Sequence, residues 1–221
     1  MADSALVLFD HWRSSASYRV RIALHLKGLA FKQHSVHLVR DGGEQHASSY
    51  RDLNPQGLVP ALVHNGQVLT QSLSICEYLD EQFPEYALLP PDPLSRARAR
   101  ALAQTVACDI HPLNNLRVQQ QIRQRFSPGK GEVVEWMNHW VSEGFSAIEQ
   151  WLSRSSAMGD FCMGDAPGLA DCFLVPQVYN AERFGCDLAP FPRIIEVTGR
   201  CRGIPAFAAA APEAQPDAPV E

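Results

Sequence analysis

The stretch Arg13-Ser14-Ser15-Ala16-Ser17-Tyr18-Arg19-Val20-Arg21-Ile22-Ala23-Leu24 decides how the rest of the chain is interpreted. It follows an apolar run, residues 5–9, whose length suits a buried strand. It continues with apolar residues at helical spacing and reaches Gly28, a residue type that often follows a helix end. Its hydroxyls therefore crowd a strand-to-helix turn, where backbone N–H groups and the helix dipole favour an anion. From this turn alone, a serine capping an ordinary helix is the simpler interpretation.

Composition and charge narrow the class of protein. The chain has 221 residues, 46% of them hydrophobic, which is enough for one large domain or two small ones. A net charge of -5 argues against a general nucleic-acid-binding protein. No stretch is apolar over a membrane-spanning length, and the start lacks the pattern of a secretory signal. The six cysteines form no C-x-x-C pair. We therefore expect a cytoplasmic protein with reduced thiols and no nucleic-acid or membrane partner.

The N-terminal part alternates between strand and helix signals. Residues 31–38 and 58–63 predict a second and a third strand, although Pro60 then requires a strand start, an edge or a cis peptide bond. Asn65-Gly66 predicts a two-residue hairpin turn into a fourth strand. Ser72 is placed to cap the helix that follows. The expected order is strand, helix, strand, then a hairpin, then a helix.

Helical patterns replace this alternation after a proline-rich connector. A long pattern over residues 95–126 contains His111-Pro112, where the proline predicts a kink. Later helical patterns cover residues 133–152, 169–184 and 192–201. Three tryptophans of the first of these are expected in the core, namely Trp136, Trp140 and Trp151. From Ala206 the chain has few large apolar groups, so we expect its end to be poorly ordered.

The predicted organisation is an α/β domain followed by an all-helical domain. The predicted boundaries are 1–84 for the first domain, 85–93 for a linker, 94–210 for the second domain and 211–221 for a tail.

The order of the motifs resembles a known family. A Ser-rich turn after the first strand, a Val-Pro dipeptide, Gln-Ser opening a helix and a helical second half together resemble a glutathione transferase. The phrase over residues 13–28 is similar to the zeta class, whose members are maleylacetoacetate and maleylpyruvate isomerases. Further phrases cover nearly the whole chain in order. They are Asp41–Gln45, Leu53–Gln56, Val59–Leu62, Gln71-Ser72, Asp109–Arg117, Leu174–Gln177, Glu182–Phe184 and Gln215–Asp217.

This resemblance implies a fold, a cofactor and an activity. The fold is a thioredoxin-like first domain and a helical second domain, usually in a homodimer. Glutathione binds the first domain with its sulfur at the Ser turn. The implied reaction is glutathione-dependent cis–trans isomerisation of a small dicarboxylate, with maleylacetoacetate to fumarylacetoacetate, in tyrosine breakdown, as the leading choice. Alternatives are maleylpyruvate isomerase, a glutathione-conjugating transferase and a non-catalytic glutathione-binding module.

The resemblance also assigns residues to the site. The catalytic candidates are Arg13, Ser14, Ser15, Arg117 and Arg183. Ser14 is preferred as the donor to the sulfur, before Ser15 and then Ser17, and the guanidiniums suit bidentate binding of carboxylates. Arg183 is equally well interpreted as a solvated surface arginine. The residues assigned to glutathione are Ser14, Ser15, Ala16, Ser17, Tyr18, Arg19, Gln45, Val59, Pro60, Gln71, Ser72, His111, Asn115, Leu116 and Arg117. No metal is expected, because His34 and His37 have no further ligand nearby.

Two positions depart from the family pattern. Ala16 stands where many zeta members have cysteine, so the nucleophile has to be the sulfur of glutathione itself. That thiolate would add to a conjugated double bond, allow rotation and leave unchanged. A free thiol has a pKa of roughly 8.5, which a helix N-terminus and nearby cations lower. Gly168 replaces the usual Ser or Thr cap three residues before Asp171, which removes half of a capping box with little expected effect on activity.

Overall fold

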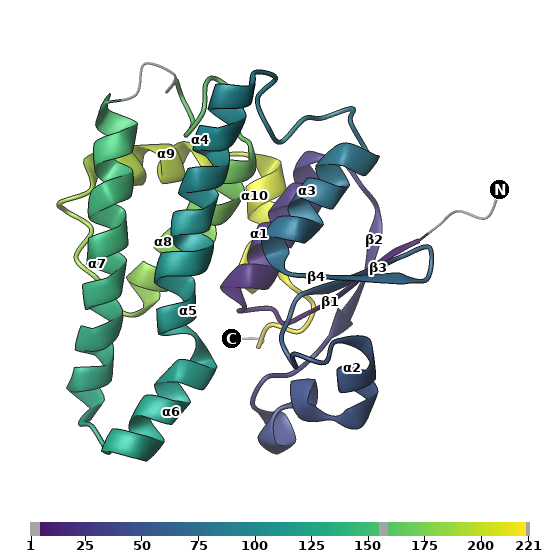
Figure 1. The fold of residues 1–221 in the computed structure, drawn as a ribbon, viewed down its shortest axis with the longest axis vertical. Helices are drawn as coiled ribbons and strands as arrows, with labels where there is room; N and C mark the ends of the chain where they lie inside the picture. The colour runs from purple at the N-terminus through teal and green to yellow at the C-terminus, as the bar shows by residue number, and fades with distance from the viewer. Residues whose placement is uncertain (1–4, 155–158, 220–221) are drawn as a thin grey trace. The chain divides into compact units, whose positions relative to one another are not determined.

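Figure 1 shows a computed structural model of the protein, which describes residues 5–154 and 159–219. The chain divides into two compact units. One unit comprises the residues up to Leu88 together with those from Ile204 onward, and the other comprises Leu89–Gly203. Within the described ranges, no helix combines the length and the apolar character needed to cross a membrane.

A four-stranded sheet in the order β2-β1-β3-β4 forms the centre of the first unit. Its strands are β1 (Leu6–Asp10), β2 (Phe31–Ser35), β3 (Ala61–His64) and β4 (Gln67–Thr70). β1 runs parallel to β2 and antiparallel to β3, which pairs antiparallel with β4. Asn65 and Gly66 both have positive φ, 51° and 73°, as the predicted two-residue turn requires. The expected succession of elements is therefore confirmed.

Helices α1 (Ser15–Leu26) and α3 (Ser72–Gln82) pack against each other in this unit, and α2 (Ser48–Leu53) is short. Two 3-10 turns, η1 (Arg40–Gly42) and η2 (Glu44–His46), precede α2. Pro60 lies just before β3, not inside it, and the Val59–Pro60 peptide bond is cis. The expectation that Ser72 caps α3 is wrong. The capping position is Gln71, whose φ is 68°, and Ser72 is the first helical residue.

The C-terminal residues also belong to the first unit, which differs from the predicted boundaries. Helix α10 (Pro205–Ala210) packs on α1, and the 3-10 turn η4 (Pro212–Ala214) follows. Arg21 Nε donates a hydrogen bond to the carbonyl oxygen of Ala210 at 3.0 Å. Gln215, placed in a tail by the sequence, is only 6% exposed. The segment is held by these hydrogen bonds and by the buried ring of Phe207, which is 1% exposed, so few large apolar residues suffice. Val220 and Glu221 lie outside the described residues.

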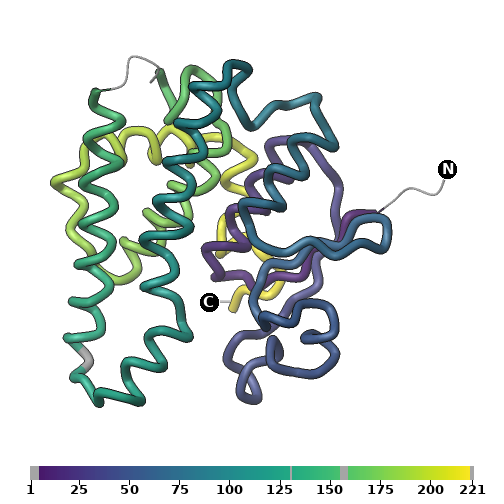
Figure 2. Tube along the Cα trace, in the orientation of Figure 1, coloured from purple at the N-terminus to yellow at the C-terminus, as the bar shows by residue number. Residues whose placement is uncertain are grey.

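The named elements of the second unit are all helices within the described residues (Figure 2). Its elements are α4 (Pro93–Gln104), the π-helix η3 (Thr105–Ile110), α5 (His111–Asn114), α6 (Leu116–Phe126), α7 (Lys130–Arg154), α8 (Leu169–Arg183) and α9 (Pro192–Arg202). The predicted long helix is irregular around Pro112, which lies in the first turn of α5. It widens into η3 ahead of the proline and breaks at Asn115, which has an extended ψ of 149°. A wide π turn is one way to accommodate a proline ring without breaking the helix at that residue.

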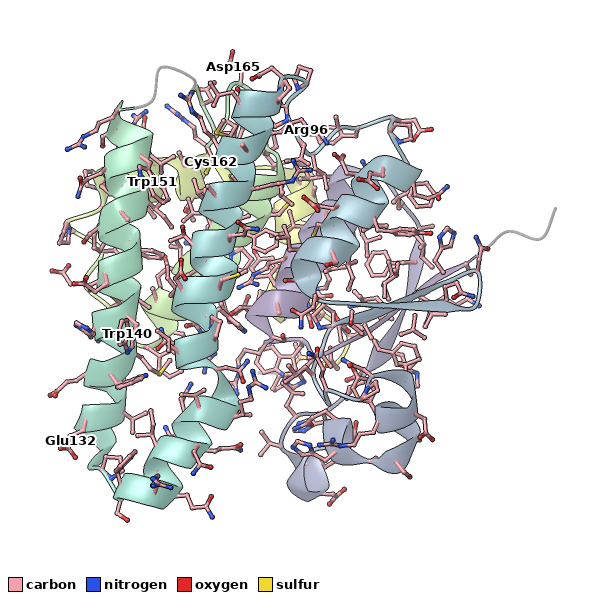
Figure 3. The ribbon with its side chains drawn as sticks, viewed as in Figure 1. Arg96, Glu132, Trp140, Trp151, Cys162 and Asp165 are labelled. Carbon is pink, nitrogen blue, oxygen red and sulfur yellow. The ribbon has the colours of Figure 1, made fainter. Side chains whose placement is uncertain are left out.

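The tryptophans of α7 do not all lie in the core, contrary to expectation. The exposed fractions of Trp136 and Trp151 are 37% and 48%. Figure 3 shows Trp140 and Trp151 on the same long helix. A stripe of smaller apolar residues fills the core instead, comprising Val133, Met137, Val141, Phe145, Ile148 and Leu152. The tryptophans flank this stripe, and helical periodicity alone does not separate its edge from its centre.

The start of α8 keeps one half of the capping box. The carboxylate of Asp171 accepts hydrogen bonds from the backbone N–H groups of Gly168 at 2.9 Å and Cys162 at 3.0 Å. Asp171 is fully buried. Glycine has no side chain to supply the reciprocal bond, as the sequence predicts.

Helix α7 passes close to Ile110 of η3 at Gly144, where an added methyl group would overlap the buried Ile110 side chain. Gly144→Ala should therefore lower the free energy of unfolding, by about 1–3 kcal/mol, because the core is overpacked. Gly199 of α9 is the matched control, since nothing lies within 4 Å of its added methyl. Gly199→Ala should raise the stability by up to about 1 kcal/mol through helix propensity alone. Urea unfolding measures both, and a shift of the same sign in the two variants would contradict this packing.

Candidate functional site

The Ser turn lies between the end of β1 and the start of α1. Ser14 is the N-cap of α1, and its Oγ accepts a hydrogen bond from the Ser17 backbone N–H at 3.2 Å. The first turn of α1 carries no acidic side chain that would offset the positive end of the helix dipole. A hydroxyl that accepts from the helix retains its own proton for donation. Capping and anion binding are therefore compatible roles for Ser14.

The hydroxyls of this turn differ in accessibility. Ser14 is half-buried, whereas Ser15 and Ser17 are 6% and 0% exposed. The Oγ of Ser17 has no hydrogen-bond partner within the part of the chain that the structure describes. Ala16 is half-buried and contributes only a methyl group. Ser14 is therefore the hydroxyl best placed to meet a ligand.

The loop before the turn is held by a buried guanidinium. Arg21 donates hydrogen bonds from Nη2 to the carbonyl oxygen of Trp12 at 2.8 Å and from Nη1 to that of His11 at 3.4 Å. Burial lowers the pKa of His11 to about 4, so its imidazole is neutral at physiological pH. Arg13 is exposed, and its guanidinium lies 4.9 Å from the centre of the Trp12 ring. The Trp12 ring thus supports a cation next to the Ser turn.

Tyr18 and Arg19 follow the Ser turn within α1 and are buried, with exposed fractions of 3% and 2%. The Nη1 of Arg19 donates a hydrogen bond to Ser72 Oγ at 3.1 Å. Because this oxygen accepts from Arg19, the Ser72 hydroxyl proton can be directed towards another acceptor at the start of α3. Gln71 is exposed, and its Nε2 donates to Gln56 Oε1 at 2.9 Å. Two segments of the predicted glutathione site, α1 and the start of α3, are thereby connected.

The remaining predicted site residues of the first unit are Gln45 and the cis-bonded pair Val59 and Pro60. Gln45 is 7% exposed, and its Nε2 donates to the carbonyl oxygen of Leu38 at 3.2 Å. Its Oε1 accepts no hydrogen bond within the described residues. Gly43 has φ 104°, and an added Cβ there would overlap the Gln45 amide, so a side chain at this position would displace Gln45.

Four of the predicted site residues of the second unit are neighbours. Asn115 caps α6 by accepting from the Arg117 N–H at 3.2 Å, and its Nδ2 lies 3.3 Å from His111 Nε2. Leu116 and Arg117 are the first two residues of α6, and Arg117 is exposed. Arg183 belongs to the last turn of α8, where its guanidinium lies 4.4 Å from the centre of the Phe184 ring.

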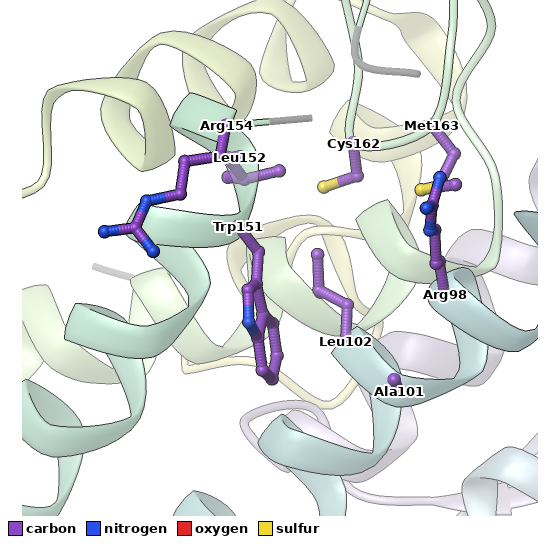
Figure 4. A pocket seen from close by; sticks show the side chains of 8 residues that line it. All are labelled: Arg98, Ala101, Leu102, Trp151, Leu152, Arg154, Cys162 and Met163. Atoms are coloured by element: carbon purple, nitrogen blue, oxygen red, sulfur yellow. The ribbon is translucent and has the colours of Figure 1, made fainter. Parts of the chain in front are cut away.

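A cavity of about 370 Å³ in the second unit contains none of the predicted residues. Leu102, Trp151 and Cys162 lie around it, and Arg98 and Arg154 lie on its two sides (Figure 4). The burial of the Cys162 thiol raises its pKa well above the ordinary value, so this sulfur stays protonated.

Asp217 is not among the predicted site residues, but its carboxylate accepts a hydrogen bond from the Trp12 N–H at the entrance to the Ser turn. The two residues are 205 positions apart, so no local pattern could have indicated the contact. The resemblance did mark Gln215–Asp217 as a shared phrase, which was the only signal available.

Comparison with known proteins supports the resemblance over the whole chain. Residues 13–82 match the model of the glutathione S-transferase N-terminal domain. A maleylacetoacetate isomerase of Pseudomonas aeruginosa is 50% identical over 96% of this chain and 98% of its own.

Two solved structures have the same fold. One is described as the holo structure of maleylpyruvate isomerase, a bacterial glutathione S-transferase of the zeta class. It has a TM-score of 0.94 and 46% identity over 96% of this chain and 100% of its own. The other is a maleylacetoacetate isomerase of Methylobacterium extorquens AM1 with bound malonate and glutathione. It has a TM-score of 0.92 and 39% identity over 97% of this chain and 100% of its own. The chain belongs to the zeta class of the glutathione transferase family.

Proposed function

We propose that the protein is a glutathione-dependent cis–trans isomerase of a maleyl keto diacid, with maleylacetoacetate as the leading substrate. The observation that carries this proposal is the Ser14 turn, a half-buried hydroxyl at a helix N-terminus whose first turn holds no acidic side chain. The relatives named above support the substrate class, because a maleylacetoacetate isomerase is 50% identical to this chain.

The chemistry needs a nucleophile that the turn can stabilise but does not itself contain. Ala16 offers no sulfur, so the thiolate of bound glutathione adds to the double bond, and the C=C bond becomes single. After rotation the carbon–sulfur bond breaks, the double bond re-forms in the trans geometry, and the thiolate is regenerated. Ser14 donates a hydrogen bond to the sulfur, and the α1 N-terminus favours its negative charge.

The carboxylates of the substrate require cations. Arg13 is an exposed guanidinium directly beside the Ser turn, and it suits a carboxylate or the enolate that forms when the thiolate adds. We assign Arg117 and Arg183 to the same task by the family resemblance. Gln45, Val59, Pro60, Gln71, Ser72, His111, Asn115 and Leu116 are assigned to glutathione on the same basis. A homodimer in the cytoplasm completes the proposal.

Maleylpyruvate is the second candidate substrate, because a maleylpyruvate isomerase is also 46% identical to this chain. The two substrates differ in the length of the keto-acid arm. The purified protein should turn over both with glutathione present, and kcat/KM should be higher for maleylacetoacetate. The reverse order would keep the chemistry and change the substrate.

Glutathione should remain at its starting concentration throughout turnover, because the thiolate leaves unchanged. A thiol titration of the reaction mixture measures this directly. Stoichiometric loss of glutathione would instead identify a conjugating transferase. Binding of glutathione without any turnover would identify a non-catalytic module.

Ser14→Ala should lower kcat/KM by about ten- to a hundredfold, because a hydrogen bond to a charged sulfur is lost. The loss of this donor should raise the pKa of bound glutathione, so the pH–rate profile should move to higher pH. Ser14→Thr keeps both the cap and the donor and should retain most of the activity. Ser15→Ala serves as the comparison for a buried neighbour. Equal losses in Ser14→Ala and Ser14→Thr would contradict the donor role.

Arg13→Ala should raise KM for the diacid about tenfold or more, since a charge-assisted contact is lost, while the Kd of glutathione changes little. The KM of Arg13→Lys for the diacid should lie between those of Arg13→Ala and the parent, because the ammonium keeps the charge but lacks the planar guanidinium. Arg98→Ala, which removes an arginine outside the predicted site, is the control. Steady-state kinetics with glutathione in excess separate these effects.

A further inference from the structure

The described end of the chain lies against the entrance to the Ser turn, within the first unit (Figure 2). The Oδ2 of Asp217 accepts hydrogen bonds from the Trp12 backbone N–H at 3.1 Å and from Ser35 Oγ at 2.7 Å. It also lies 3.9 Å from His11 Nδ1. The low pKa of His11 means that this last contact involves a neutral ring at physiological pH. The Trp12 N–H and the Ser35 hydroxyl are therefore the donors that hold the carboxylate.

Asp217 is presented to Trp12 by a segment with its own anchors. The Nε2 of Gln215 donates to the carbonyl oxygens of Ala209 at 2.9 Å and Ala211 at 2.7 Å. Its Oε1 accepts from Gln33 Nε2 at 2.8 Å. Because both sides of the buried Gln215 amide are bonded, the backbone that carries Asp217 is placed independently of Trp12. The carboxylate can thus fix Trp12, instead of being fixed by it.

Trp12 transmits this placement to a functional side chain. Its backbone is bonded on both sides, to Asp217 through the N–H and to Arg21 through the carbonyl oxygen. Its ring lies under the Arg13 guanidinium, with 4.9 Å between the guanidinium carbon and the ring centre. A guanidinium over an indole face is attracted to it and loses part of its freedom of orientation.

We propose that Asp217 is a positioning residue for the dicarboxylate substrate. It fixes Trp12, and the Trp12 ring in turn orients Arg13 towards a substrate carboxylate. The inference rests on the proposed function, because it takes from it the role of Arg13. It gives the C-terminal segment a task in substrate binding, although Asp217 itself contacts no substrate.

Binding of malonate to the glutathione-loaded full-length protein tests this inference, with calorimetry as the readout. Malonate is a dicarboxylate that needs no turnover. Asp217→Ala should weaken malonate binding about three- to tenfold and leave the Kd of glutathione within about twofold. Asp217→Asn keeps an acceptor oxygen for the Trp12 N–H and should retain most of the affinity. Ser35→Ala removes the other donor to the same carboxylate but keeps the bond to Trp12, so it should bind malonate more tightly than Asp217→Ala does.

A double-mutant cycle separates positioning from general damage. In an Arg13→Ala background, Asp217→Ala should cause no further loss of malonate affinity, because the residue through which it acts is already absent. Equal losses in both backgrounds would overturn the inference, as would an unchanged affinity in Asp217→Ala. If Asp217→Ala does not fold, Trp12→Leu tests the second step, since it keeps the backbone bond to Asp217 and removes the ring. Parent-like malonate binding in Trp12→Leu would also overturn it.

Malonate binding and isomerase activity together distinguish an error in the proposed function from an error in the role of Asp217. If the malonate affinities of the variants follow the expected order but the parent protein isomerises neither diacid, the isomerase proposal alone is contradicted. A parent protein that isomerises but shows additive losses in the cycle contradicts the role of Asp217 alone. Absence of malonate binding to the glutathione-loaded parent protein would overturn the inference, because Arg13 would then bind no carboxylate.

Discussion

The buried ion pair between Arg21 and Asp10 is the interaction on which the first unit depends. Its two side chains are 0% and 1% exposed, and Nη1 lies 2.8 Å from Oδ2. Burial raises the pKa of Asp10 and lowers that of Arg21, and each charge opposes the shift of the other. Removing one partner would strand a buried charge, which costs about 3–5 kcal/mol in proteins.

The same guanidinium connects its own helix to two further parts of the chain besides its partner strand. Arg21 projects from α1, bonds the carbonyl oxygens of the loop that enters the Ser turn, and bonds Ala210 at the end of α10. Planar donors in several directions allow one arginine to satisfy all of these acceptors at once. The backbone that enters the Ser turn is thereby anchored on the side of the strand, as the thiolate site proposed for this turn requires.

Much of this unit follows from local chemistry, so it could be predicted. The Ser14 cap, the helix end at Gly28, the Asn65–Gly66 turn and the position of Pro60 near β3 each express a short-range preference. Other features depend on distant partners and escaped prediction. The exposure of Trp136 and Trp151 and the membership of α10 in the first unit were set by packing and by hydrogen bonds across the fold.

The sequence by itself determined the anion-favouring turn, the absence of a thiol at Ala16 and, through its ordered phrases, the family. Turn conformation, helix caps and residue identity depend on residues that are close together in the sequence, so they can be predicted from the sequence alone. Only the tertiary structure decided that Ser14 is the accessible hydroxyl, that Arg19 donates a hydrogen bond to Ser72, and that Asp217 accepts one from the Trp12 N–H. Those features depend on burial and on partners 53 and 205 positions apart, which arise only when the chain is folded.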